Sequence, residues 1–177
     1  MIFDYMFSPQ VQPMIPTPTH GSLPSGHATE AFLMARLLWK LLIHSNAPQY
    51  KDHGYWGQML MRQAARIATN RTVAGVHFPI DSVAGGILGL VLAEHVCQMS
   101  CGGNHQSSVD FNAPNFDPED DFDWHKFYRV NGDKLKKKAG SKCSVWLKTK
   151  RHHCDDVIPS PILKWLWDKA LEEWKDL

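Results

Sequence analysis

Residues 70–81 read NRTVAGVHFPID and join two segments in which apolar residues recur at helical spacing. The alanine-glycine pair in the middle indicates a turn, and Pro79 suits the first position of the following helix. Arg71, His77 and Asp81 therefore lie on either side of a connection between two helices. This short stretch brings a guanidinium, an imidazole and a carboxylate to one end of a helical pair.

A second motif, PSGH at residues 24–27, precedes another segment of helical periodicity. A given tetrapeptide arises by chance in a chain of this length with a probability on the order of one in a thousand at average composition. The apolar spacing predicts three helices, which run from Ala28 to about Ile43, from Trp56 to Arg71, and from Pro79 to about Val96.

The topology of these helices decides where the two motifs meet, because short connections make consecutive helices antiparallel neighbours. The first predicted helix runs away from His27, and the second returns to Arg71. The third starts beside His77 and Asp81. Both motifs are therefore expected at the same end of an all-α bundle, and the small residues at 84–89 permit close packing of the third helix.

The chain has 177 residues, 44% of them hydrophobic, which is enough for one compact domain. Its 19 basic and 18 acidic residues give a net charge of +1, so no global field favours nucleic acid or an anionic membrane. The longest uncharged apolar run, residues 82–93, is shorter than the roughly 20 residues of a membrane-spanning helix. We expect a soluble protein without a transmembrane segment, located in the cytoplasm, or periplasmic or secreted if an upstream signal was removed. No C-x2-C pair occurs among the four cysteines, so the sequence favours no metal site.

The composition changes after the third predicted helix. Residues 101–160 are polar and charge-segregated, with five carboxylates in 117–123 and eight basic residues but no acidic one in 134–151. We expect solvated loops in this region. Residues 161–177 predict an amphipathic C-terminal helix whose tryptophan-rich side docks on the core or on a partner. With the catalytic-type core at 1–100, these segments make one domain.

The residue types of the two motifs suit phosphoryl transfer. That chemistry needs cations and N–H donors around the phosphoryl oxygens, a nucleophile in line and an acid for the leaving group. Arg71 can bind two oxygens at once. The Ser25 hydroxyl and the Gly26 N–H can donate to others at a helix N-terminus, where the dipole also favours an anion. Each of the three also has an ordinary structural role, as helix-end cation, helix cap or turn glycine.

Two histidines and a carboxylate supply the reacting groups. His77 is the expected nucleophile, and Asp81 can accept its second N–H and stabilise the cation that forms. His27 can then protonate the leaving oxygen and later activate water. The predicted site therefore has catalytic residues His77, His27 and Asp81 and phosphate-binding residues Arg71, Ser25 and Gly26.

PSGH and R-x5-H-x3-D resemble the second and third signature motifs of the type 2 phosphatidic acid phosphatase and vanadium-dependent haloperoxidase superfamily, over about residues 20–96. The resemblance implies an all-helical bundle, of which this chain would be only the C-terminal half. It also implies that His77 is the phosphohistidine nucleophile or the vanadate ligand, with Asp81 as its orienting partner and His27 as acid and base. A phosphatase of this type needs no cofactor, whereas a haloperoxidase uses vanadate.

The superfamily's first motif, K-x6-R-P, is not found, because no Lys or Arg precedes Pro24. Three explanations are open: the chain is part of a longer protein, a partner subunit or second copy in a homodimer supplies the missing cations, or the protein is a weakened or inactive relative. Three functions follow. The first is a metal-independent phosphatase acting on a small phosphorylated substrate or a lipid phosphate. The second is a vanadium haloperoxidase using hydrogen peroxide and halide in the same pocket, and the third is a non-catalytic module that binds phosphate or a partner.

Overall fold

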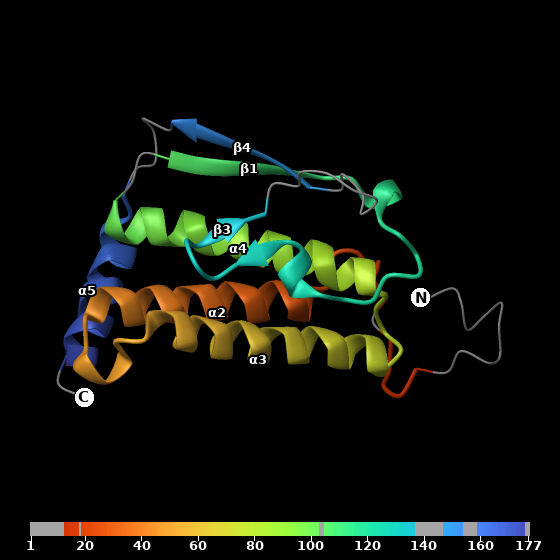
Figure 1. Ribbon diagram of the computed structural model, residues 1–177, viewed down its shortest axis with the longest axis horizontal. Coiled ribbons are helices and arrows are strands. Elements are labelled where there is room, and N and C mark those ends of the chain that lie inside the picture. Colours follow the sequence, from red (N-terminus) through yellow and green to blue (C-terminus); the bar gives the residue numbers. More distant parts are fainter. Residues whose placement is uncertain (1–12, 18, 103–104, 137–146, 154–158, 176–177) are drawn as a thin grey trace.

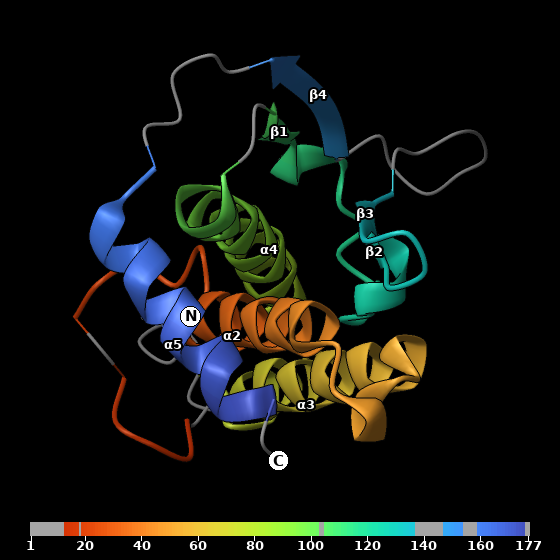
Figure 2. The same cartoon turned by 90° about the vertical axis from the view of Figure 1, so that its left-hand side faces the viewer.

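The computed structural model describes residues 13–17, 19–102, 105–136, 147–153 and 159–175, and most of them are helical (Figure 1). In the layer of three long helices, α2 lies between α3 and α4 (Figure 1). A further helix, α5, crosses the ends of α2 and α4 (Figure 2). The helices are α2 (Gly26–Ser45), α3 (His53–Val73), α4 (Pro79–Cys101) and α5 (Pro161–Lys175). The predicted all-α fold class is confirmed.

Local sequence explains where the long helices begin and end. Ser25 caps α2, with its Oγ accepting from the Ala28 N–H at 3.4 Å, and Asn46 ends the helix in the left-handed conformation at φ 54°. Asp52 caps α3 through a 2.9 Å hydrogen bond from the Tyr55 N–H. A short 3₁₀ turn, Pro48–Tyr50, connects the two helices. All three predicted helices are present, and each extends beyond its predicted bounds.

Glycines in the second and third turns of α4 bring its backbone into close contact with the first turn of α2. A methyl group added at Gly85 would lie 2.5 Å from the carbonyl oxygen of Ser25, and one at Gly89 would collide with the carbonyl oxygen of Thr29. Larger residues at either position would push the helices apart. The small-residue patch therefore fixes the start of α2 against the start of α4.

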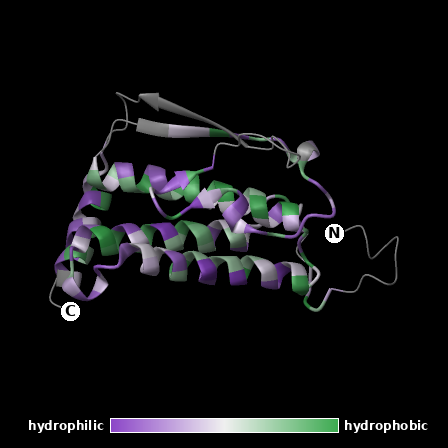
Figure 3. Cartoon of the chain, viewed as in Figure 1, coloured by the Kyte–Doolittle hydropathy of each residue, from purple (hydrophilic) through white to green (hydrophobic). Residues whose placement is uncertain are grey.

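The core runs along α2, where side chains from all three long helices meet. Phe32 and Trp39 of α2, Met61 of α3 and Leu90 of α4 are all almost fully buried. Burying a side chain of this size stabilises the fold by about 1.5–3 kcal/mol. Hydrophilic residues lie on the outer side of α3, away from this core (Figure 3).

The polar region that was predicted as loops contains strands, so this part of the prediction is wrong. β1 (His105–Phe111) pairs antiparallel with β4 (Leu147–His153), with Val109 opposite Thr149. A small hairpin follows from the pairing of two short strands, β2 (Tyr128–Arg129) and β3 (Lys134–Leu135). Backbone pairing across a long sequence separation leaves little local signal, which explains the error. Two 3₁₀ turns, Ala113–Asn115 and Trp124–Lys126, complete the region.

The same region also contributes to the core. Trp124, Phe127, Tyr128 and Val130 are each at most 5% exposed and pack into the main hydrophobic cluster. The average composition of this region does not reveal these aromatic residues, because many acidic residues surround them. The side chains of the basic stretch from 137 to 151 lie outside the described residues.

Helix α5 docks on the bundle through part of its aromatic side. The Trp167 ring lies 5.7 Å from the His44 ring, and the Trp174 ring lies 5.8 Å from the Tyr50 ring. Trp165, however, is 59% exposed. The predicted docking on the core is therefore confirmed for one face of the helix.

One helix in the described part of the chain, α4, is long and apolar enough to cross a membrane by length and composition alone. Half of its apolar window is buried inside the fold. The sequence argument considered only the uncharged run, and the helix extends beyond that run at both ends. Its length therefore corrects the expectation that no segment reaches spanning size, although the core helix of a soluble protein passes the same test.

Candidate active site

The turn between α3 and α4 carries His77 back over the end of α3. The Gly75 N–H donates to the Thr72 carbonyl at 2.9 Å, and the Val76 N–H donates to the Arg71 carbonyl at 3.2 Å. Gly75 has φ 74°, a conformation that side chains other than glycine rarely adopt. The turn thereby places the end of one helix and the start of the next beside each other.

His77 and Asp81 form a buried pair at the start of α4. Nδ1 of His77 lies 3.3 Å from Oδ2 of Asp81, and the two residues are 5% and 3% exposed. The same oxygen accepts the Phe78 N–H at 2.9 Å, so the helix start itself holds the carboxylate in place. Because an ionised carboxylate only accepts, Nδ1 of His77 is the donor in this contact, and Nε2 is the ring nitrogen that the contact does not use.

Asp81 is ionised despite its burial. Burial would raise the pKa of the carboxyl group, but hydrogen bonds from the His77 ring and the Phe78 N–H, with a further one from Ser22, hold that pKa below its usual value. The pair is therefore suited to carrying positive charge on His77 during a reaction.

The PSGH motif meets this pair through the backbone. The Ser25 N–H donates to the Asp81 carbonyl at 3.0 Å, and Ser25 itself is fully buried beneath the first turn of α2. Its hydroxyl has the structural role of helix cap. Gly26, the next residue, is exposed, and apart from its chain neighbours and its own helix backbone no described atom lies within 4 Å of the position that a Cβ would occupy there. The space beside Gly26 is open.

His27 lies on the exposed first turn of α2, and the charges of the other motif affect its pKa. Burial lowers the pKa of its imidazole, and the nearby Arg71 and His77 lower it further, while Glu30 opposes them. Arg71 and His77 act on the pKa of His27 because they lie close to its ring. The two motifs therefore converge, as the topology predicted.

Arg71 contributes a donor that the fold does not use. It lies in the last turn of α3, and its Nε is buried without a hydrogen-bond partner among the described residues. Leaving a buried donor of a charged group unpaired costs about 1–3 kcal/mol or more. An anion at this position would satisfy it.

All six residues predicted from the sequence lie at this end of the bundle. Ser22 was missed, although its side chain hydrogen-bonds to Asp81. It stands outside both motifs and has no distinctive spacing, so no signal in the sequence points to it.

A comparison with protein-family models finds one match, the PAP2 superfamily, over residues 4–100. The match covers more than half of the chain and contains both motifs. The chain belongs to the PAP2 superfamily. No curated protein and no solved structure is significantly similar to it.

Membership of the PAP2 superfamily suggests a phosphatase-like enzyme that hydrolyses phosphate esters. The match begins well before PSGH, yet residues 4–23 contain no Lys or Arg. The PAP2 region of this chain therefore lacks upstream cations while keeping both downstream motifs.

Proposed function

We propose that this PAP2 protein hydrolyses phosphate monoesters through a phosphohistidine on His77, without a metal ion or other cofactor. The buried His77–Asp81 pair carries the proposal, because it directs Nε2 of the imidazole away from the carboxylate. Convergence with Arg71 and His27 supports it further.

The first step transfers the phosphoryl group to the enzyme. Nε2 of His77 attacks phosphorus, an N–P bond forms, and the bond from phosphorus to the ester oxygen breaks. Protonated His27 gives its proton to the departing oxygen, so an alcohol leaves. The ionised Asp81 stabilises the positive charge on the His77 ring.

The second step regenerates the enzyme. His27, now neutral, takes a proton from a water molecule whose oxygen attacks phosphorus. The N–P bond breaks, inorganic phosphate forms, and His77 recovers its lone pair. Each residue ends the cycle in its starting protonation state.

The anion is held by groups that surround this histidine. The unpaired Nε of Arg71 donates to one phosphoryl oxygen, and the Gly26 N–H at the start of α2 donates to another. The open space beside Gly26 leaves room for the ligand. The Ser25 hydroxyl caps the helix and can also donate its own proton to an oxygen.

A partner or a further segment supplies additional cations in this proposal. The first PAP2 motif would add a lysine and an arginine, and one preorganised donor is worth about 3–4 kcal/mol in the transition state. Without them the chain alone is expected to act several powers of ten more slowly than with them. A homodimer and a complex with another subunit both fit this expectation.

Hydrolysis of p-nitrophenyl phosphate by the purified chain tests the proposal. We expect His77→Ala to abolish turnover and His95→Ala to leave it unchanged, because His95 lies about 20 Å along α4 from Asp81. Radiolabelled phosphate should be trapped on the wild type as an acid-labile, base-stable adduct. Turnover that survives His77→Ala would overturn the assignment.

The haloperoxidase and binding-module alternatives are tested with the same protein. Vanadate should inhibit hydrolysis as a mimic of the five-coordinate transition state. Bromination by the vanadate-loaded protein in the presence of peroxide would favour the haloperoxidase. Phosphate binding without any turnover, even with upstream cations supplied, would favour the non-catalytic module.

A further inference from the structure

A second concave site lies on the other half of α2, away from both motifs. It is a cavity of 980 Å³ between α2, the C-terminal half of α4 and the β2–β3 hairpin. Lys40, which lines it, is about 20 Å along α2 from His27. The phosphate site does not extend to this cavity.

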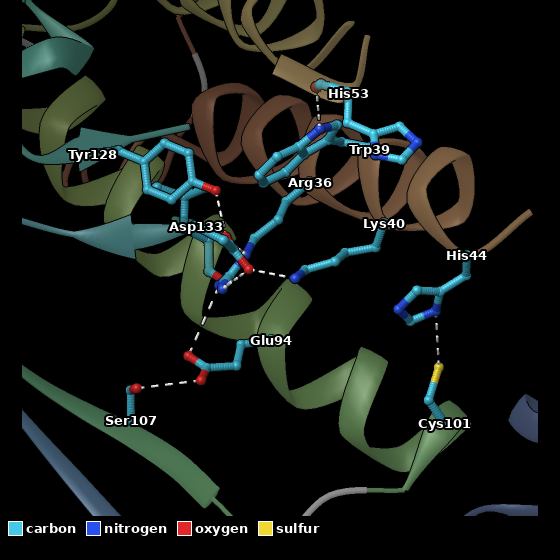
Figure 4. Close-up of polar contacts among 11 residues, drawn as sticks. Arg36, Trp39, Lys40, His44, His53, Glu94, Cys101, Ser107, Tyr128 and Asp133 are labelled. Atoms are coloured by element: carbon cyan, nitrogen blue, oxygen red, sulfur yellow. Dashed lines mark hydrogen bonds and ion pairs between the residues drawn. The ribbon is translucent and has the colours of Figure 1, made fainter. Parts of the chain in front are cut away.

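The hairpin wall of the cavity is clamped to α2 by a buried ion cluster (Figure 4). Arg36, only 5% exposed, donates to both carboxylate oxygens of Asp133 at 2.9 and 3.0 Å. Lys40 Nζ lies 2.5 Å from the same carboxylate, and the Tyr128 hydroxyl donates to it at 2.5 Å. Asp133 has φ 48°, so these contacts hold the hairpin turn in one conformation.

These contacts give each carboxylate of the cavity a basic partner. Two carboxylates line it, Asp133 and Glu94. Asp133 is matched by Arg36 and Lys40, and Glu94 lies 3.8 Å from Arg36. The Arg36–Lys40 pair therefore balances both negative charges of the lining.

Three more cations line the cavity: Arg129, Lys134 and Lys136. Arg129 and Lys134 are direct cross-strand partners in the hairpin, an arrangement that is unfavourable for like charges. Lys136 donates to the backbone carbonyl of His125, which carries no charge, and it has no ion pair with another described residue. Among the residues that the structure describes, the lining thus has an excess of three positive charges. The ion cluster holds the hairpin that carries them.

We propose that this cavity binds a small phosphorylated organic anion of nucleotide size. A phosphate group between Arg129 and Lys134 would relieve their repulsion and accept a hydrogen bond from each. The volume is at the upper end of the roughly 300–1,000 Å³ of small-molecule sites, so it holds more than a phosphate ion. Uncharged lining from Gly132 and Leu135 is available to the organic part.

Calorimetric titration of ATP into the full-length chain tests the proposal. The His77→Ala variant serves as the background, because it prevents hydrolysis in the proposed mechanism. We expect ATP to bind in the cavity, separately from binding at the phosphate site, with an affinity that falls as salt rises. The double substitution R129Q/K134Q should weaken binding by about tenfold or more. The single substitution R129Q should weaken it less.

Matched controls distinguish ATP binding in this cavity from binding at the phosphate site and from non-specific attraction to surface cations. The substitution R66Q removes an exposed cation of α3 outside the cavity and should leave ATP affinity unchanged. Arg71→Ala removes an anion donor of the phosphate site and should leave the ATP affinity of the cavity unchanged. Loss of ATP binding in Arg71→Ala with retention in R129Q/K134Q would overturn the proposal.

Two further probes define the ligand class. Inorganic phosphate should bind more weakly than ATP, because it leaves most of the cavity unfilled. Equal affinity for the two would contradict a nucleotide-sized ligand. Binding of a duplex DNA oligomer at Arg129 and Lys134, with none of ATP, would replace the proposal with a nucleic-acid surface.

Discussion

The Ser25 N–H donates to the carbonyl oxygen of Asp81 at 3.0 Å, and this bond joins the two motifs across the fold. The bond ties the N-cap of α2 to the first turn of α4. His27 thereby lies in the first turn of α2, and His77 lies directly before the N-cap of α4. Positioning of the candidate site therefore depends on how closely α2 and α4 approach.

Removing the charge of Asp81 tests its proposed role in orienting His77. In Asp81→Asn the side chain can still accept the Phe78 N–H, but it no longer stabilises a His77 cation. We expect kcat to fall by about 10²–10⁴-fold with little change in KM. Asp52→Asn is the matched control, because Asp52 caps α3 at the far end of the bundle. Equal losses in the two variants would indicate a purely structural role.

The pH dependence of hydrolysis tests His27 as the acid. Burial, Arg71 and His77 place the pKa of His27 below the usual histidine value of 6.5, so its protonated form is depleted as pH rises through that lowered pKa. We expect kcat/KM to decline on the alkaline side with a midpoint below 6.5.

Glu30→Gln sharpens the same test. The charge of Glu30 raises the pKa of His27, so its removal should lower that pKa and move the alkaline decline to lower pH. Glu119→Gln, on the acidic segment, should leave the profile unchanged. A decline that moves to higher pH in Glu30→Gln would contradict the assignment.

The ion cluster behind the second cavity predicts an acid-sensitive fold. Burial would raise the pKa of Asp133, but Arg36 and Lys40 lower it to about 2, against 3.8 for the unfolded chain. A carboxyl group with a depressed pKa stabilises the fold above the unfolded pKa, and this contribution is lost as pH falls through the folded pKa. We expect roughly 2 kcal/mol of unfolding free energy to disappear between about pH 4 and pH 2.

Urea titration of Asp133→Ala measures the same cluster at neutral pH. The substitution leaves Arg36 buried without its carboxylate, which should cost about 3–5 kcal/mol. Asp121→Ala, at an exposed position, should cost less than about 0.5 kcal/mol. Similar midpoints for the two variants would show that the cluster contributes nothing to stability.

The sequence predicts those features of the fold and site that depend on the local spacing of residues. The helices follow from apolar periodicity, and the convergence of His27, Arg71 and His77 follows from short connections between them. The Arg36–Asp133 contact spans 97 residues and has no local signal. The β1–β4 pairing was missed for the same reason.

Composition also does not predict which residues of the polar region are buried. Trp124 and Phe127 lie among acidic and basic residues, yet both belong to the main hydrophobic cluster, where Phe127 packs against Phe32 and Gly86. Their contribution depends on where the chain returns to the bundle. The contact of Asp133 with Arg36 fixes where the chain returns to the bundle. Helical spacing in the sequence does not reveal this contact.

Substitutions at two glycines, Gly85 and Gly26, distinguish effects on helix packing from effects on ligand binding. A Cβ at Gly85 would lie 2.5 Å from the Ser25 carbonyl oxygen, so Gly85→Ala must push α2 from α4. We expect it to destabilise the fold by about 1–3 kcal/mol and to reduce turnover as the motifs separate. Thermal unfolding and p-nitrophenyl phosphate hydrolysis report the two effects.

Gly26→Ala should have the opposite pattern. Apart from its chain neighbours and its own helix backbone, no described atom lies within 4 Å of its Cβ position. Alanine is also favourable at a helical position, so unfolding should be nearly unchanged. The added methyl group would instead occupy the space assigned to the anion beside the Gly26 N–H. We expect the inhibition constant for phosphate and the KM to rise, by about tenfold if one donor is blocked. Unchanged phosphate affinity in Gly26→Ala would mean that the anion lies elsewhere along the α2–α4 contact.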